Sequence, residues 1–260
     1  MKIRQSISKR HYILLSISGI FLVFLLWSFL SYSKLITPIF LPSPTQVLYA
    51  ALILFKDNLL YDILASSLRI IFGFVIAAAI SIPVGIIIGT QKRFEAFIEP
   101  TVSFIRYIPP SAFVPLSILW FGIGELEKYF VIFIGVAPYL IFFVANAVSH
   151  VRQEFVDAGL TLRANTKQIY TKIIIPSAMP QMWEALQLMF SVAWTFIIFA
   201  EIIAANSGLG SILIKSQRFL KTDKAIAIVI IIGLLGLITD FLFKITYKMF
   251  FPWTEKSRYA

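Results

Sequence analysis

The sequence has no cysteine among its 260 residues and only two histidines, His11 and His150. The absence of cysteine excludes a disulfide framework, thiolate metal sites and cysteine catalysis. Two histidines so far apart in the chain do not indicate a metal site. The sequence also has no GxxxxGK[ST] phosphate-binding loop, so we do not expect this chain to hold ATP in that way.

Charged residues are scarce as well, at 14% of the chain, while apolar residues make up 59%. The mean hydropathy is +0.87. A soluble domain of this length has too much surface to carry so few charges. The apolar runs are long and continuous, whereas an outer-membrane barrel would show short alternating segments. The sequence therefore predicts an all-α integral membrane protein.

Six apolar segments are candidates for membrane-spanning helices. A turn and an interfacial helix are expected over residues 91–106, before the third of these segments. The third segment is short for a span unless residues 101–107 extend it. The six predicted spans are residues 12–30, 66–90, 111–121, 129–148, 181–205 and 225–243.

The predicted organisation has three parts. Residues 1–60 hold an N-terminal tail, the first span and an external loop, and residues 61–250 form the transmembrane domain. Residues 251–260 are a cytoplasmic tail. A cleaved signal peptide is the alternative for the first span, but its apolar run is longer than the roughly 7–15 residues of a signal core.

The distribution of Lys and Arg predicts the orientation. With the N-terminus in the cytoplasm, 15 of the 23 basic residues fall in cytoplasmic segments, seven in external segments, and Arg69 inside a span. Both termini are therefore expected in the cytoplasm. Membrane topology also explains the formal charge of +10 better than nucleic-acid binding does. The external basic cluster over residues 215–224 runs against the rule and suits an external partner, an anion, or a plain solvated loop.

Two local patterns predict helix contacts. Ser43 is a candidate N-cap with Pro44 in the first turn of a short external helix within residues 45–64. Gly85 and Gly89 in the second span form a GxxxG pattern, which lets another helix approach closely.

The longest charged interruption covers residues 151–180 and lies between the fourth and fifth spans. Phe155, Ala158 and Leu162 are spaced like one face of a short helix. A helix pair held between two spans would act as a rigid connection that moves both spans together. An ordinary amphipathic segment lying on the lipid headgroups is the alternative.

A second short helix is expected after the first. Asn165 or Thr166 can cap it. Pro176 and Pro180 are expected to end it before the fifth span.

Ionisable residues inside spans are costly and usually face inward. Arg69 and Glu201 are expected at similar depth near the external side, so we predict that they pair or line the outer end of a translocation path. Separate snorkelling to the interface is the alternative. Asp240 and Lys244 have the spacing of a structural helical ion pair.

The fifth span offers the other candidates for the path. Its polar or aromatic residues are Ser191, Trp194 and Thr195, and packing is the alternative role for each. The acidic residues of the chain are scattered and no nucleophile has a base nearby in sequence. We therefore expect a transport subunit and not an enzyme.

The charged loop resembles the coupling loop of type I ABC-importer permeases, in which EAA is followed by Gly and then by Ile-x-Pro or Leu-Pro. The corresponding residues are Asp157-Ala158-Gly159, Arg163-Ala164 and Ile175-Pro176. Over about residues 38–250, further segments resemble the nitrate/sulfonate/taurine branch. These segments are Leu41-Pro42-Ser43-Pro44, Arg106-Tyr107-Ile108-Pro109-Pro110, the run from Pro115 to Glu125, Trp194, Ala200-Glu201 and Ser207-Gly208-Leu209-Gly210.

This resemblance implies a set of partners in a bacterial inner membrane. They are a cytoplasmic ATPase dimer that binds ATP and Mg, an external substrate-binding protein, and a second copy of the permease. This chain itself is expected to bind no cofactor. The residues implied in ATPase coupling are Glu154, Asp157, Ala158, Gly159, Arg163, Ala164, Ile175 and Pro176.

The chain departs from the family pattern at three positions. Asp157 replaces glutamate, Gly159 replaces the second alanine, and Arg163 replaces the glycine of the turn. A residue other than glycine in the left-handed conformation costs roughly 1 kcal/mol or more. Either Asn165 takes that conformation or the turn is built differently.

The branch suggests a small, anionic solute such as a sulfonate, taurine or nitrate. A thiamine-precursor pyrimidine or another heterocycle is the alternative solute. An ion-gradient-driven secondary transporter is the alternative mechanism, but it predicts internal repeats, and the sequence has no convincing repeat. A membrane-embedded enzyme and an exporter or channel are further alternatives.

Overall fold

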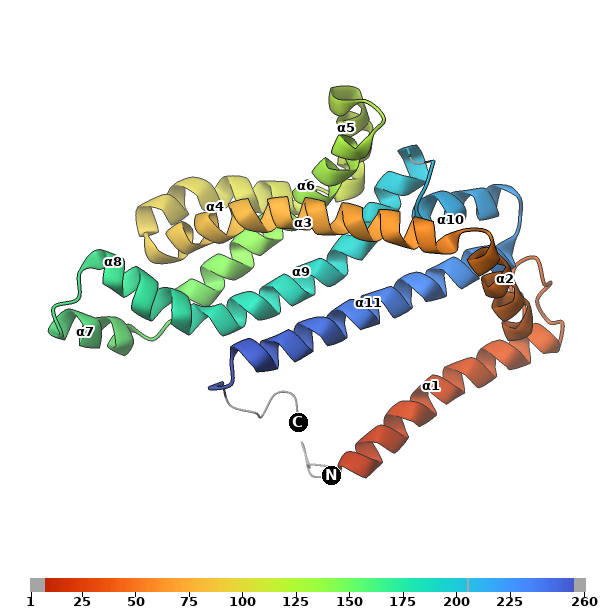
Figure 1. Ribbon diagram of the computed structural model, residues 1–260, viewed down its shortest axis with the longest axis horizontal. Coiled ribbons are helices and arrows are strands. Elements are labelled where there is room, and N and C mark those ends of the chain that lie inside the picture. Colours follow the sequence, from red (N-terminus) through yellow and green to blue (C-terminus); the bar gives the residue numbers. More distant parts are fainter. Residues whose placement is uncertain (1–7, 205, 255–260) are drawn as a thin grey trace. The chain divides into compact units, whose positions relative to one another are not determined.

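The computed structural model describes residues 8–204 and 206–254, which form helices and turns without a β-strand (Figure 1). The chain divides into two compact units. One unit comprises Met1–Leu59 and Ile212–Ile230, and the other comprises Leu60–Ser211 and Ile231–Ala260. Each unit is described by itself below.

The first unit contains α1 (Lys9–Tyr32) and α2 (Pro44–Lys56). The segment between them is fastened to α1, because the Trp27 indole donates to the Pro42 carbonyl at 3.0 Å. Ser43 caps α2 in a capping box with Gln46, and Pro44 opens the helix. The predicted cap is therefore confirmed.

The long helix α3 (Leu59–Thr90) starts seven residues earlier than the predicted second span at residue 66. Its GxxxG pattern lies against α6 (Glu125–Ser149) of the second unit. A Cβ on Gly85 would lie 2.7 Å from that of Val144, and one on Gly89 would lie 2.6 Å from the Ala145 carbonyl. The predicted close approach is confirmed, since only glycine leaves room for it.

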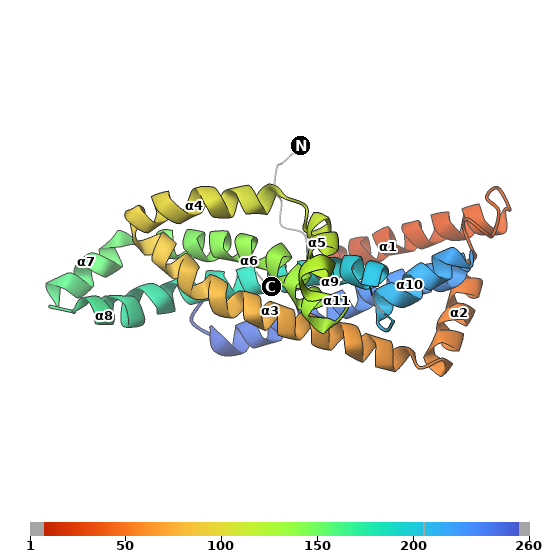
Figure 2. The same ribbon diagram turned by 90° about the horizontal axis from the view of Figure 1, so that it is seen from above.

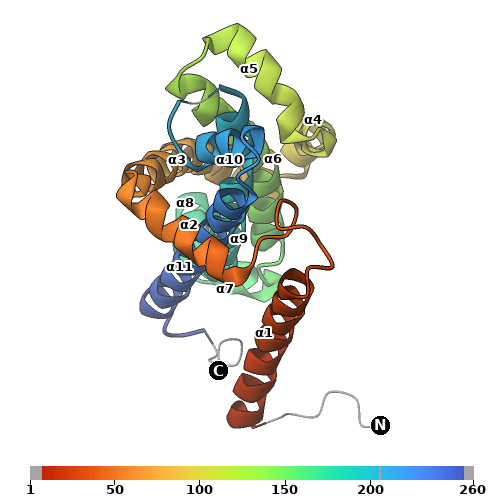
Figure 3. The same ribbon diagram turned by 90° about the vertical axis from the view of Figure 1, so that its right-hand side faces the viewer.

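The third predicted span is part of a bent element. Helix α4 (Lys92–Tyr107) meets the segment Pro110–Phe121, which contains α5 (Phe113–Phe121), at 80° (Figure 3). Pro109 and Pro110 cause the break, since a residue before proline is driven out of the helical region. Residues 111–121 alone are too short to span. The predicted interfacial helix and third span are the two arms of one candidate span.

Five helical runs among the described residues are long and apolar enough to cross a membrane, and the bent pair is the sixth candidate. The five runs are Arg10–Tyr32, Leu59–Thr90, Glu125–Ser149, Thr166–Ile203 and Thr222–Phe250. The last of them is α11.

Helices α6 and α9 (Ile175–Ala204) pack along each other and form the core of the second unit, with α4 beside α6 (Figure 2). Val131, Val136 and Leu140 of α6 are fully buried, and so is Ile197 of α9. This packing makes α6 and α9 a firmly joined pair.

The sequence predicted that the second helix of the charged loop ends at Pro176 and Pro180. This prediction is wrong, because the helix continues through both prolines. A short α8 (Thr166–Gln168) runs through a π-helical segment, Ile169–Ile174, directly into α9. In this segment the Ile175 N–H bonds the Tyr170 carbonyl five residues back. The wider π turn gives room to Pro176, whose ring would clash with the carbonyl four residues back in an ordinary helix.

Candidate functional site

The charged loop forms a compact helix pair at one end of the second unit, where α7 (Gln153–Thr161) precedes α8 (Figure 1). Gly159 of α7 is buried against Ile173 of the π segment, and a Cβ there would collide with the Ile173 side chain. The departure from alanine at Gly159 therefore fits the bulk of Ile173. Helix α7 is seated directly on the segment that continues into α9.

The turn after α7 is a Schellman motif with Arg163 in the left-handed position, at φ 58°. The Ala164 N–H bonds the Gly159 carbonyl at 3.0 Å, and the Arg163 N–H bonds the Leu160 carbonyl at 2.9 Å. Asn165 is extended and caps α8 in a capping box with Gln168. The alternative that Asn165 takes the left-handed conformation is therefore wrong, and its predicted capping role is confirmed.

One face of α7 is apolar and points away from the rest of the chain. Phe155 is 46% exposed and Leu162 is 82% exposed. Ala158 lies between them and is also exposed. Asp157, beside this face, accepts a hydrogen bond from the Gln153 side chain at 3.0 Å. An exposed apolar patch with a charged rim is typical of a protein interface.

The coupling residues named from the sequence fall into two groups. Glu154, Asp157, Ala158 and Arg163 are exposed, so they are available to a partner. Gly159 is buried, while the remaining three, Ala164, Ile175 and Pro176, are half-buried. Gly159 packs within the chain, and the three half-buried residues are only partly accessible to a partner.

Arg69 and Glu201 form a buried ion pair at the other end of the second unit. Arg69 is 6% exposed and Glu201 is 0% exposed. The Arg69 Nη1 lies 2.8 Å from the Glu201 Oε1. The predicted pair is confirmed.

The pair has a third member, Glu125, which is the first residue of α6 and for which the sequence analysis predicted no partner. The Arg69 Nε and Nη2 donate to the two Glu125 oxygens at 2.7 and 2.8 Å. Nη1 and Nη2 also donate to the backbone carbonyl and the hydroxyl of Ser207. All five N–H groups of the guanidinium are therefore engaged. In this conformation Arg69 offers no free donor to a solute.

The same network holds the turn Ser207-Gly208-Leu209-Gly210 at the start of α10 (Leu209–Arg218). Three successive backbone N–H groups donate to side chains: Gly208 to Asp62 at 2.6 Å, Leu209 to Ser66 at 2.9 Å, and Gly210 to Glu201 at 2.9 Å.

The glycine in this turn has a structural reason. Gly208 has φ +104°, and a Cβ on it would collide with the Glu201 carboxylate. The turn at residues 207–210 therefore packs directly against the Arg69–Glu201 pair, and a side chain at position 208 would not fit.

The path candidates on α9 do not share one surface. Trp194 is 4% exposed, and its Nε1 has no hydrogen-bond partner among the described residues. Thr195 is exposed and Ser191 is half-buried. Ser191 bonds back to the Gln187 carbonyl at 3.1 Å. Ser191 and Thr195 thus share an outward face, while Trp194 points into the chain.

The predicted helical ion pair on α11 is present, with the Lys244 Nζ 2.7 Å from the Asp240 Oδ2. The Gln187 side chain of α9 donates to the other oxygen of Asp240. Its structural role is confirmed, because it ties α11 to α9.

Residues 81–251 match the model of the family described as "Binding-protein-dependent transport system inner membrane component". The chain belongs to this family. The match covers the bent element, the charged loop, α6 and α9, and it begins after Arg69, so only Glu125, Glu201 and the turn at residues 207–210 of the ionic network fall inside it.

Relatives of this permease include transport proteins of the branch that the sequence motifs indicated. The taurine transport system permease TauC of Escherichia coli is 30% identical, over 97% of this chain and 94% of its own. The putative aliphatic sulfonates transport permease SsuC of Bacillus subtilis is 27% identical, over 88% and 83%. The bicarbonate transport permease CmpB of Synechococcus elongatus is 29% identical, over 88% and 86%. The branch assignment is confirmed.

The fold of the permease is also found in a solved structure. A chain of the inward-facing MetNI methionine ABC transporter superposes with a TM-score of 0.66 at 17% identity. The alignment covers 74% of this chain and 95% of that chain. The predicted type I importer permease fold is confirmed.

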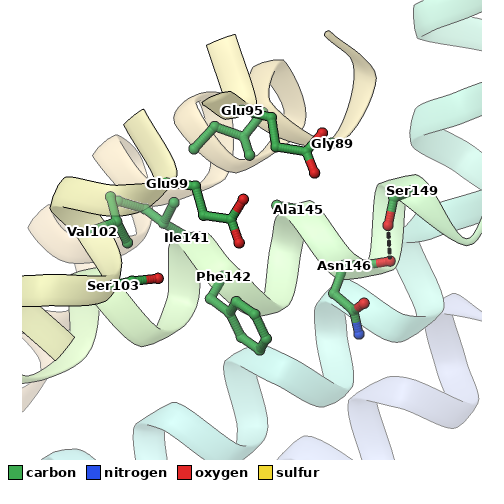
Figure 4. Close-up of a pocket in the computed structure, with 11 residues that line it drawn as sticks. Gly89, Glu95, Glu99, Val102, Ser103, Ile141, Phe142, Ala145, Asn146 and Ser149 are labelled. Carbon is green, nitrogen blue, oxygen red and sulfur yellow. Dashed lines mark hydrogen bonds between the residues drawn. The ribbon is translucent and has the colours of Figure 1, made fainter. Parts of the chain in front are cut away.

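The permease has two hollows near the charged loop, on either side of the end of α6. A cavity of about 140 Å³ lies between α3, α4 and α6 and is lined by Glu95 and Glu99 of α4 and Ser149 of α6 (Figure 4). A larger groove of about 300 Å³ lies between α6 and α9. Asn146 lines both hollows.

Proposed function

We propose that this chain is the permease subunit of an ATP-driven importer, and that α7 docks into a cytoplasmic ATPase. The observation that carries the proposal is the exposed apolar face formed by Phe155, Ala158 and Leu162. Charged residues of both signs surround this face, among them Asp157, Arg163 and the pair Arg152–Glu154 at 3.0 Å, and such a mixed rim around an apolar patch suits a protein partner.

The course of the backbone supports one route of coupling. Helix α7 is seated on the π segment through Gly159 and Ile173, and the π segment continues into α9 without a break. Closure of two ATPases would displace α7, and α9 would move with it. ATP shifts the equilibrium only through its different affinity for the two states of the complex.

The proposed assembly has two permease chains, two ATPase chains and an external binding protein. One permease chain supplies one half of a two-fold path. ATP and Mg would be held by the ATPase chains. The helix pair and both chain termini would lie in the cytoplasm. The names of the relatives support a small anionic solute of the sulfonate, taurine or bicarbonate kind.

The test is affinity purification of the intact complex in mild detergent. We expect an ATPase of roughly equal abundance to accompany the wild type, and Asp157→Lys to lose it together with ATP-dependent uptake. Glu99→Lys is the matched control, because it makes the same charge change at an exposed position on α4. If the chain purifies alone and transports in ATP-free vesicles under an ion gradient, the proposal fails.

A further inference from the structure

Two short loops lie together at one end of the first unit (Figure 1). Residues 33–43 follow α1, residues 219–221 join α10 to α11, and together they are called the loop pair. The Thr222 hydroxyl donates to the Ile39 carbonyl, so the two loops are joined directly. Because α1 and α11 are both candidate spans, loops that directly follow one and precede the other lie at the depth of the lipid headgroups.

The loop pair exposes large apolar side chains that the described part of the chain leaves uncovered. In the first loop Leu35 is 69% exposed and Phe40 is 76% exposed. In the second loop Phe219 is 74% exposed and Leu220 is 68% exposed. Exposed apolar patches mark contacts with a membrane or a protein, and aromatic rings are favoured at the membrane interface.

The second loop holds one of its apolar residues outward in an unfavourable conformation. Leu220 has φ 53°, in the left-handed region that residues other than glycine seldom adopt. The turn is a Schellman motif, in which the Lys221 N–H bonds the Ser216 carbonyl at 2.8 Å and the Leu220 N–H bonds the Gln217 carbonyl at 3.0 Å. A leucine that is both strained and exposed indicates a contact outside the chain.

Basic side chains flank the exposed apolar residues. Lys34 precedes those of the first loop, and Arg218 and Lys221 stand on either side of those of the second. All three are exposed, and none has an ion-pair partner within residues 8–204 and 206–254. The loop pair therefore presents three unpaired positive charges beside its apolar side chains.

The acidic residues near the loop pair do not balance these charges. Asp57 is already paired with Lys224, at 3.6 Å. Asp223 lies in the first turn of α11, where the helix dipole stabilises a carboxylate. The surface is therefore positive as a whole and complements an anionic group.

We propose that the loop pair is a binding site for anionic phospholipid. Its apolar side chains lie among the upper acyl chains, and its three basic side chains contact the headgroups. A soluble protein is the less favoured occupant, because the loops lie at headgroup depth beside two spans. The site does not depend on an ATPase. It also gives a physical reason for part of the basic cluster that runs against the distribution of Lys and Arg.

The absence of cysteine allows a single introduced thiol to report on the loop pair. Phe219→Cys would carry an environment-sensitive fluorophore in the full-length permease, reconstituted into phosphatidylcholine vesicles. Either phosphatidylglycerol or phosphatidylcholine with a nitroxide near the top of an acyl chain would be added at equal mole fraction. The control position is Leu237→Cys, which is 67% exposed in the middle of α11.

We expect the label at Phe219→Cys to be shielded from a neutral water-soluble quencher. The nitroxide on phosphatidylglycerol should quench it about two-fold more strongly than the nitroxide on phosphatidylcholine, and Leu237→Cys should show no preference. A label open to the aqueous quencher would overturn the lipid site and leave the surface to a soluble protein. Equal quenching by the two lipids at Phe219→Cys would overturn the anionic headgroup site.

Charge variants in the Phe219→Cys background separate the local site from the net charge of the permease. Arg218→Ser with Lys221→Ser should abolish the preference for phosphatidylglycerol, whereas Arg218→Lys with Lys221→Arg should retain it. Lys167→Ser with Lys172→Ser removes the same two charges at exposed positions of the charged loop and should also retain it. A preference that survives the first variant, or that is lost equally in the charged-loop variant, would overturn the proposal.

Discussion

Two substitutions at the partners of Arg69, Glu201→Gln and Glu125→Gln, isolate the effect of burial on the strength of an ion pair. Arg69 contacts Glu201 at 2.8 Å and Glu125 at 2.7 Å, but the Glu201 side chain is 0% exposed and that of Glu125 is 50% exposed. Removing one member of a buried pair costs about 3–5 kcal/mol, because the other charge is left uncompensated. Exposed pairs contribute about 0.2–1 kcal/mol.

We therefore expect Glu201→Gln to lower the free energy of unfolding by about 3 kcal/mol and Glu125→Gln by about 1 kcal/mol or less. The Glu201 change is the larger for a second reason, since its carboxylate also accepts from Ser66 and from the Gly210 N–H. An introduced amide would turn an N–H₂ group toward these donors.

The assay is thermal unfolding of the purified permease in mild detergent, followed by tryptophan fluorescence. At about 2–4 °C per kcal/mol for a chain of this size, Glu201→Gln should lower the Tm by about 6–12 °C. Glu125→Gln should lower the Tm by about 4 °C or less. Equal shifts, or a larger shift for Glu125→Gln, would refute the burial argument.

A charge swap is a poor control at this site, because Arg69→Glu would place a second carboxylate against Glu125. A double-mutant cycle with Arg69→Met and Glu201→Gln avoids that repulsion. Residues that share one network show coupling energies of about 0.5–3 kcal/mol. A cycle in which the two losses simply add would mean that the pair contributes nothing of its own.

Two further pairs of substitutions test backbone geometry. Gly85→Val puts a Cβ 2.7 Å from that of Val144, so we expect loss of monodisperse protein in size-exclusion chromatography. Gly233→Val should elute like the wild type, because nothing lies within 4 Å there; similar profiles would contradict the close packing. Arg163→Gly should keep ATPase co-purification, since glycine takes the left-handed conformation freely, whereas Arg163→Val should weaken it. The opposite order would assign the role to the Arg163 side chain.

Much of the fold follows from the sequence because lipid imposes simple rules. A span needs about 20 apolar residues, so long runs such as residues 129–148 are recognisable in isolation. Local capping is equally readable, and Ser43 and Asn165 both cap the helices that they precede. The pair Arg69–Glu201 could be inferred because two charges at equal depth in apolar surroundings have few other partners.

The remaining features depend on contacts that sequence spacing does not encode. Glu127 and Lys128 come before the predicted fourth span, which begins at residue 129, yet they are only 0% and 3% exposed. Glu125 joins Arg69 only because α6 begins beside α3. The π segment before α9 could not be predicted from the sequence either. Pro176 alone predicts a helix break, and the wider turn that accommodates this proline has no sequence pattern of its own.

Helix α9 is held differently at its two ends, and this difference decides which end could move if α7 were displaced. Its C-terminal end is fixed by Glu201, whose carboxylate contacts α3 through Ser66 and Arg69 and contacts the start of α10. Its N-terminal end continues from the π segment, which α7 contacts through Gly159 and Ile173. Between the two ends, Ser191 and Thr195 lie on the outward face of the helix. A displacement of α7 would therefore reach these residues through an unbroken helix, while the C-terminal end stays anchored to its neighbours.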